Sequence, residues 1–76
     1  MVKIFELIDS AGCCLHVERY NKTWFCCIEY EGHDTGHTVN YSLKFALREV
    51  FDLVPKHVTT FQEIKEKLIN ETENLS

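Results

Sequence analysis

Apolar and polar residues alternate along two stretches in the first half of the chain, residues 13–19 and 23–30. Successive side chains of a β-strand point to opposite faces, so alternation of this kind is typical of a half-buried strand. The stretches are separated by Tyr20, Asn21 and Lys22, and asparagine tolerates the positive φ that a tight hairpin turn requires. The apolar set is Leu15 and Val17 in the first stretch and Trp24, Cys26, Ile28 and Tyr30 in the second.

An apolar run at residues 2–8 predicts a further strand before these two. The run is rich in Val, Ile, Phe and Leu, which favour strands. It stops at residues 9–12, whose sequence Asp-Ser-Ala-Gly is typical of a turn. The three stretches together predict an antiparallel meander.

The turn between the second and third predicted strands sets which residues lie opposite one another. A two-residue turn at 21–22 pairs His16 with Cys27, whereas a turn at 20–21 places Cys14 opposite Cys27. A shift of one residue would move every side chain of a strand to the other face, and both of these registers keep the apolar sets together. Both therefore bring Cys14, His16 and Cys27 to the face opposite the apolar set.

The second half of the chain predicts two helices after a loop. Residues 31–37 are mostly polar and contain two glycines, which indicates a loop, and residues 38–41 form a short fourth strand or lead into the first helix. Ser42 is a good N-cap, and Pro55 ends the helix because the residue before a proline is pushed out of the helical region. The stripe between them repeats at helical spacing and comprises Leu43, Ala46, Leu47, Val50, Phe51 and Val54.

The second predicted helix begins near Thr60, which forms the pattern of a capping box with Glu63. Residues 71–76 are predicted to fray at its end. The whole chain, residues 1–76, is predicted to form a single small α+β domain, a three-stranded antiparallel β-meander followed by two helices packed on one face. The apolar stripe of this helix is narrower and comprises Phe61, Ile64 and Leu68.

Composition and charge narrow the range of partners. Twelve acidic and eight basic residues give a net charge of -4, which disfavours direct binding to nucleic acid or to anionic membranes. No apolar stretch approaches the roughly 20 residues that span a bilayer. The charged start of the chain is no signal peptide, so we expect a cytoplasmic protein with reduced thiols.

The four cysteines form two adjacent pairs, and adjacent side chains of a strand diverge. Cys13 and Cys26 are predicted to face the core, and Cys14 and Cys27 the opposite face. Zinc signatures use cysteines two to four residues apart, so packing is favoured over a metal site, and no cofactor is predicted. The turn at 20–21 would also allow a disulfide between Cys14 and Cys27. The candidate metal ligands are Cys14, His16 and Cys27, with His33 or His37 as the fourth.

No residue is predicted to be catalytic. A cysteine nucleophile needs a base and an oxyanion donor beside it, and although His16 can pair with Cys27, an exposed sheet face offers no pocket. Residues 33–37 combine His, Asp and Thr, which are also ordinary residues of loops. We therefore predict that the protein is not an enzyme.

The predicted sheet carries more apolar residues than two helices can cover. With a tight first hairpin, Phe5 and Leu7 join the uncovered face, and exposed apolar patches on small domains usually mark an interface. The expected partner is a larger protein, or a second copy of the chain in a homodimer. The predicted contact residues are Phe5, Leu7, Tyr20 and Phe25, with an acidic border of Glu29, Glu31 and Asp34.

These features predict a non-enzymatic protein-binding module, a small acidic inhibitor or regulator of a larger partner. An acidic border can occupy a basic groove, such as that of a complex that processes nucleic acid. In size, charge and layout the chain resembles small inhibitors from phages and mobile elements, such as anti-CRISPR proteins, although no residue motif carries the resemblance. The alternative is a zinc-binding or thiol-bearing regulatory protein that uses Cys14, His16 and Cys27.

Overall fold

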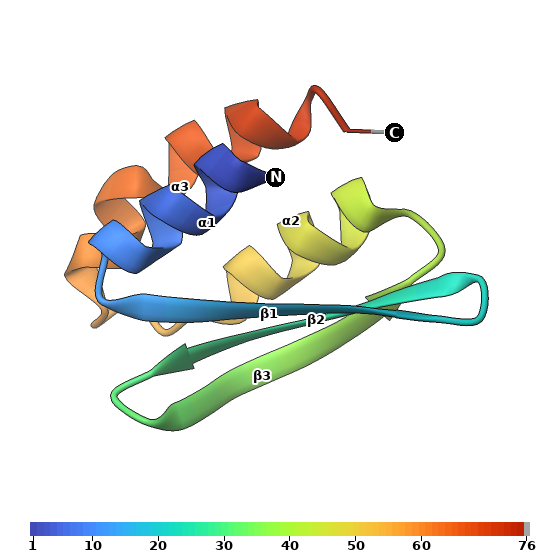
Figure 1. Cartoon of the computed structure of the whole chain (residues 1–76). Helices are drawn as coiled ribbons and strands as arrows, with labels where there is room; N and C mark the ends of the chain where they lie inside the picture. The colour runs from blue at the N-terminus through green and yellow to red at the C-terminus, as the bar shows by residue number, and fades with distance from the viewer. Residues whose placement is uncertain (76) are drawn as a thin grey trace.

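One antiparallel sheet carries all the described helices on a single face (Figure 1). The computed structural model describes residues 1–75, and its three strands follow one another in the order β1-β2-β3. None of the described helices is both long enough and apolar enough to cross a membrane. The elements are α1 (Val2–Ser10), β1 (Cys13–Tyr20), β2 (Thr23–Tyr30), β3 (His33–Asn40), α2 (Leu43–Leu53) and α3 (Thr59–Thr72).

The predicted three-stranded meander followed by two helices is confirmed, but its first strand was assigned wrongly. Residues 2–8 belong to the helix α1. A short apolar run fits a strand and a buried helix equally well, and here Ile4, Ile8 and Ala11 share one helical face and are all buried. Gly12, with φ of 77°, then turns the chain into β1, so the predicted first hairpin does not form.

The third strand lies where the sequence predicts a loop. Residues 33–37 together with residues 38–40 of the short strand predicted at 38–41 make up the whole of β3, and the connection shrinks to Glu31 and Gly32. Both turn residues have positive φ, 53° and 78°, as a tight hairpin turn requires. Strand β3 lies at the edge of the sheet with one face open to water, which lets a polar sequence form a strand.

The register between β1 and β2 is the one given by the turn at 21–22. His16 lies opposite Cys27 and Val17 opposite Cys26, and Asn21 has φ of 56°. This register places Leu15 and Ile28 in the core on the helix side of the sheet.

Both predicted C-terminal helices are present, but only the first has the predicted cap. The Ser42 side chain accepts a hydrogen bond from the backbone N–H of Phe45 at 3.4 Å, and α2 ends before Pro55. The predicted capping box is wrong, because Thr60 instead donates to the carbonyl of Ala11 at 2.7 Å. Within residues 71–76, Glu71 and Thr72 belong to α3 and Thr72 is buried, whereas Ser76 lies outside the described residues.

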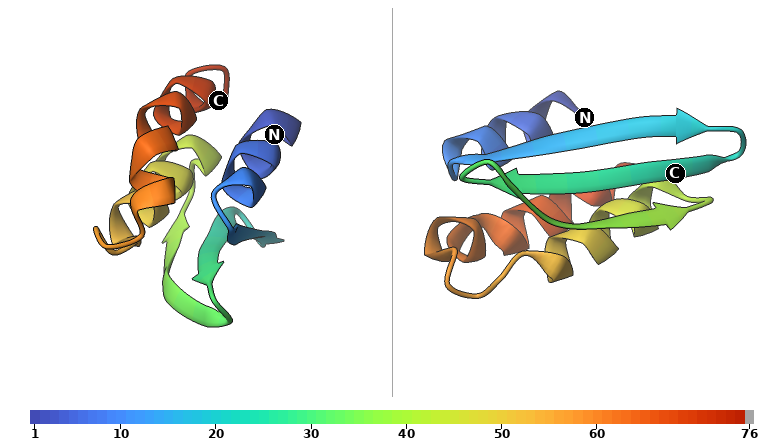
Figure 2. Two further views of the ribbon diagram at one scale, coloured as in Figure 1. Left: turned by 90° about the vertical axis from the view of Figure 1, so that its left-hand side faces the viewer. Right: turned by 90° about the horizontal axis from the view of Figure 1, so that it is seen from below.

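The helices form two tiers above the sheet (Figure 2). Helix α1 contacts β1, α2 contacts β2 and β3, and α3 packs against α1 and α2. Between α2 and α3, the rings of Phe51 and Phe61 lie with their centroids 6.0 Å apart. Thr38 ties the sheet to α2 by donating a buried hydrogen bond to the carbonyl of Ala46 at 2.7 Å. No described helix covers the other face of the sheet, which is called the outer face below.

Two phenylalanines of α2 test this arrangement with the same substitution. Phe51 is 0% exposed, so Phe51→Ala removes a full core side chain and should lower the free energy of unfolding by about 3–5 kcal/mol. Phe45 is 53% exposed, so Phe45→Ala should change it by less than about 1 kcal/mol. Urea unfolding followed by circular dichroism measures both. Equal losses in the two variants would contradict the packing described for α2.

Candidate functional site

The outer face is built from alternate residues of the three strands. Its members follow from the register, because directly paired residues of neighbouring strands share a face. They are Cys14, His16, Glu18 and Tyr20 of β1, Thr23, Phe25, Cys27 and Glu29 of β2, and Asp34, His37 and Val39 of β3.

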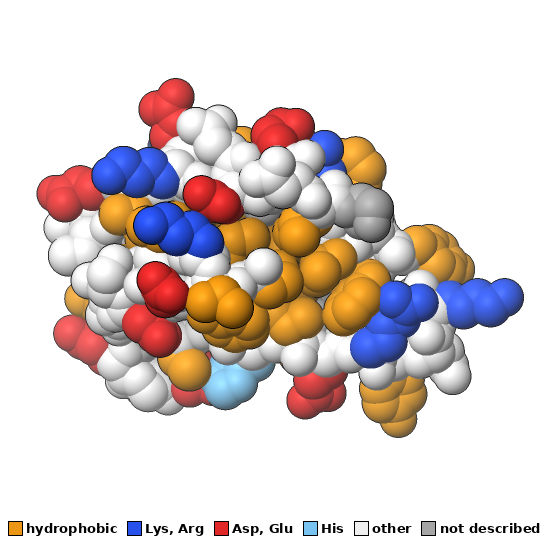
Figure 3. Space-filling model, turned by 45° about the horizontal axis from the view of Figure 1, so that its top comes forward, with side chains coloured by type: hydrophobic (Ala, Val, Ile, Leu, Met, Phe, Trp, Pro, Cys, Tyr) orange, Lys and Arg blue, Asp and Glu red, His pale blue; other side chains and the backbone are white. Residues whose placement is uncertain are grey.

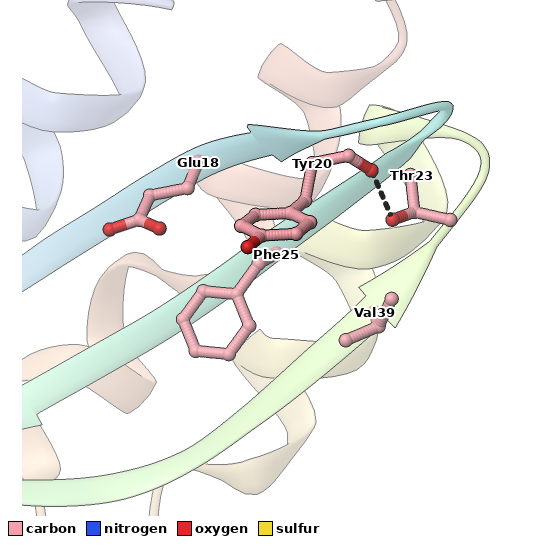
Figure 4. Close-up of a pocket in the computed structure, with 5 residues that line it drawn as sticks. All are labelled: Glu18, Tyr20, Thr23, Phe25 and Val39. Atoms are coloured by element: carbon pink, nitrogen blue, oxygen red, sulfur yellow. Dashed lines mark hydrogen bonds between the residues drawn. The ribbon is translucent and has the colours of Figure 1, made fainter.

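One end of the outer face is apolar and hollowed (Figure 4). Tyr20, Phe25 and Val39 project from three different strands and, with Glu18 and Thr23, line an open hollow of about 350 Å³. Tyr20 is 71% exposed and Val39 55% exposed. Thr23 donates a hydrogen bond to the carbonyl of Tyr20 at 2.8 Å, which closes the turn beside the hollow.

A second hollow, of about 660 Å³, lies around the turn between β1 and β2. Tyr20 and Thr23 are shared by both hollows, so the hollowed surface continues past the tip of the hairpin, where Asn21 and Lys22 make its lining more polar. The aromatic rim of the second hollow is completed by Tyr41, which follows β3 and is largely exposed.

The other end of the outer face carries titratable side chains in two rows. His16, Cys27 and His37 lie side by side across the three strands, and Glu29 with Asp34 lies in the next row. His16 Nε2 lies 2.7 Å from Glu29 Oε1, an ion pair when the histidine is protonated.

Two further contacts connect these rows to their neighbours. Cys14 Sγ lies 3.7 Å from His16 Nε2. The ring of His37 stacks on Phe25 with centroids 5.3 Å apart, which joins the polar end to the apolar end.

Cys27 is on the predicted face but is not exposed as predicted. Only 6% of its surface is accessible, because it sits on the central strand between longer side chains of both neighbouring strands. Burial, which is the largest cause, acts together with a hydrogen bond to Asp34 and the charge of that carboxylate to raise the pKa of the Cys27 thiol to about 12. Asp34 in turn accepts a hydrogen bond from the N–H of Gly36 at 2.7 Å, and this bond is the main cause of its lowered pKa.

The other cysteines are placed as predicted. Cys13 and Cys26 are buried in the core, burial raises the pKa of Cys26 to about 11, and Cys14 is exposed. All four thiols are free, and the register does not place Cys14 directly opposite Cys27, so the geometry proposed for a disulfide between them is absent.

The candidate metal ligands are only partly brought together. Cys14, His16, Cys27 and His37 share the outer face, but His33 pairs with Tyr30 outside the two rows. Among residues 1–75, no group of three or more His, Cys, Asp or Glu side chains is arranged so that it could hold a metal ion.

The predicted contact residues divide between two sides of the molecule. Tyr20, Phe25, Glu29 and Asp34 lie on the outer face, and Glu31 lies in the adjoining turn. Phe5 and Leu7 do not belong to this face, because they lie on α1 and pack partly buried against the core.

Sequence reasoning missed three residues that line the hollow at the apolar end, Glu18, Thr23 and Val39. Val39 was missed because residues 31–37 were predicted to form a loop. Without a register between β2 and β3, the face of the sheet on which Val39 lies could not be assigned. The pair Glu31-Gly32 was the available signal, since it suits a two-residue hairpin turn. Glu18 alternates correctly in the sequence, but only the register places it across from Phe25.

Comparison of the chain with models of known protein families, with curated proteins and with solved structures found no match.

Thiol alkylation tests the packing of the outer face. At pH 8, iodoacetamide should modify Cys14 at least about tenfold faster than Cys13, Cys26 and Cys27, because burial shields the other three and burial raises their pKa values. Peptide mass spectrometry gives the rate at each site. In guanidinium chloride all four should react alike, and native modification of Cys27 at the rate of Cys14 would contradict its placement.

Proposed function

We propose that the protein is a non-enzymatic binding module that docks the outer face of its sheet on a larger protein. The observation that carries the proposal is the apolar end of this face, where Tyr20, Phe25 and Val39 stay accessible although every helix packs on the other side. Aromatic side chains at the centre of a patch supply much of the energy of protein association.

The shape of the hollows favours a protein partner over a small ligand. Small-molecule sites enclose most of their ligand within a concave pocket. Here Tyr20 and Val39 are exposed at the rim, and the lining side chains all project from one face of the sheet, so they do not enclose a ligand (Figure 4). Such a surface suits a protruding apolar side chain of another protein.

The charges of the outer face favour a basic partner. Glu18, Glu29 and Asp34 lie on it, whereas none of its strand residues is a lysine or arginine, and Lys22 lies beyond them at the hairpin tip. The nearest arginine in sequence, Arg19, points to the other side and lies 4.7 Å from the ring centre of Trp24. A negatively charged surface is attracted to positively charged proteins and associates with them faster. Basic grooves are typical of proteins that handle nucleic acid.

In this proposal the protein inhibits or regulates its partner by covering such a groove. The mode of action agrees with the resemblance in size and charge to small inhibitors from phages and mobile elements. It requires no chemistry from the cysteines and histidines, whose contacts hold the polar end of the face in place.

Substitution of Phe25 tests the proposal. Phe25→Ala should weaken binding to the partner by about 2 kcal/mol or more, about 30-fold in Kd, because the ring lines the hollow at the centre of the face. Immobilised wild-type protein and both variants, Phe25→Ala and Phe45→Ala, are exposed to host lysate, and the retained proteins are identified and purified for calorimetry. Phe45 is a matched control, since it is a half-exposed phenylalanine on α2.

A partner retained equally by Phe25→Ala and wild type would refute the role of the outer face. Circular dichroism of Phe25→Ala must first show an intact fold, because Phe25 also stacks on His37. In the same assay, Glu29→Lys with Glu31→Lys should slow association and reduce its salt dependence.

The contact between Cys14 and His16 at 3.7 Å favours, as a second candidate, a thiol-bearing or zinc-binding regulatory protein. Zinc would require new side-chain rotamers, because Glu29 engages His16 and Asp34 engages Cys27 in the present arrangement. Native mass spectrometry after addition of zinc distinguishes this candidate, since one tightly bound ion that is lost in Cys14→Ser would support it.

A further inference from the structure

The two edges of the sheet differ in their ability to accept another strand. In β3, the pairing with β2 is irregular between Cys27 and Glu29, and Gly36 has φ of 132°. The side chain of Asp34 also occupies the backbone N–H of Gly36 at 2.7 Å. Irregular backbone and local side-chain bonds of this kind block further pairing along β3.

Strand β1 has none of these obstacles. All eight of its residues pair with β2 without a register shift. Within residues 1–75, no side chain hydrogen-bonds to the backbone of residues 13–19, and β1 contains neither glycine nor proline. An edge strand that is straight, long and uncapped is a template for pairing with another chain.

Apolar surface accompanies this open edge. Helix α1 lies above β1, and Phe5, Val17 and Trp24 remain only partly buried against the core. Figure 3 shows apolar side chains gathered into a continuous band on this side of the molecule. A strand added to β1 would therefore also have apolar side chains to contact above the sheet.

We propose that the added strand is β1 of a second copy, which creates a six-stranded antiparallel sheet across a two-fold axis. The axis passes through Val17, so that Val17 faces the same residue of the other copy. His16 then lies opposite Glu18 of the other copy, and Glu18 opposite its His16. Residues that pair directly share a face, so both charge pairs form on the outer face.

The neighbouring registers lack this complementarity. With the axis at His16, two imidazoles oppose each other, and with the axis at Glu18, two carboxylates do. Two carboxylates directly opposite one another on a sheet are destabilising, and two imidazoles repel each other when both are protonated, whereas a protonated His16 is attracted to Glu18. Of the three registers, only the axis at Val17 brings opposite charges together, and this self-complementarity favours a second copy of this chain as the occupant.

Helix α1 contributes to the same contact. Its N-terminal end lies above the middle of β1 in both Figure 1 and Figure 2, and Val2 is 72% exposed. In the proposed dimer the two α1 helices approach each other beside the axis and cover this apolar side chain. The outer faces of the copies become one continuous surface, so the dimer goes beyond the proposed docking function. It engages Glu18 and Tyr20 at the β1 edge of that surface and leaves Phe25 and Val39 free.

The register makes a cross-linking prediction. Tyr20 lies opposite Cys14 of the other copy, so Tyr20→Cys should form a covalent dimer with two disulfides under mild oxidation. Positions 14 and 20 of one chain are about 20 Å apart along β1, so the bond cannot form within a chain. Non-reducing electrophoresis and intact mass, at twice the chain mass less four hydrogens, report the product.

Two controls make the cross-link specific. Adding Cys14→Ser to Tyr20→Cys should abolish it, and Val39→Cys, which exposes a thiol on the same face of β3, should not produce it. If Tyr20→Cys stays monomeric, or if Val39→Cys dimerises to the same extent, the proposed dimer is wrong. Phe25→Ala combined with Tyr20→Cys should cross-link normally, which separates this proposal from the docking function.

Charge exchange tests the uncross-linked dimer by sedimentation equilibrium. His16→Glu places carboxylates opposite Glu18 and should raise the dimer Kd about tenfold or more. The double variant His16→Glu with Glu18→Arg restores opposite charges and should return the Kd to within about threefold of wild type. A wild-type protein that is monomeric at 0.5 mM (roughly the weakest dimer worth assigning), or a double variant as weak as the single one, would overturn the proposal.

Discussion

The structure depends on one constraint: neighbouring residues of the central strand β2 must occupy two different environments. Cys26 and Ile28 are fully buried under the helices, while Phe25, Cys27 and Glu29 face the side that no described helix covers. Helices α1 and α2 bury the inner face directly, and α3 completes the core from above. A small domain has too few residues for a second covering layer, so the outer face must be stable in water.

The outer face meets this requirement by arranging its own side chains. A small thiol at the centre, Cys27, is buried by the longer residues beside it, and this burial together with the neighbouring Asp34 raises its pKa to about 12. The pair between His16 and Glu29 and the stacking of Phe25 on His37 hold those longer residues over the sheet. The polar end is therefore packed, and the apolar end around the hollow is left as the surface available to a partner.

The two edge strands of the sheet, β1 and β3, differ in whether they can pair with a further strand. Strand β3 is closed by its irregular backbone and by the bond from Gly36 to Asp34, whereas β1 is regular along its full length. A sheet with one closed and one open edge can grow in one direction only, which favours a closed dimer over a filament. Docking centred on Phe25 and backbone pairing along β1 share only side chains at the β1 edge, such as Glu18 and Tyr20, so one molecule can do both.

The sequence by itself determined the helices and strands whose hydrophobic patterns are long, or whose turns and caps involve only residues close together in the chain. The alternation through Ile28, the turn at Asn21, the cap at Ser42 and the stripe ending at Val54 all depend on residues close together in the chain. They therefore predicted β1, β2 and α2, as the stripe from Phe61 to Leu68 predicted α3, and they placed Cys13 and Cys26 in the core. Only the tertiary structure decided the rest. The run at residues 2–8 fits either a strand or a helix, and packing of Ile4 and Ile8 on β1 and α3 selected the helix. Polar β3 became a strand because β2 supplied its hydrogen bonds, and the site followed from it, since Val39 and His37 reach Phe25 and Cys27 only through that pairing.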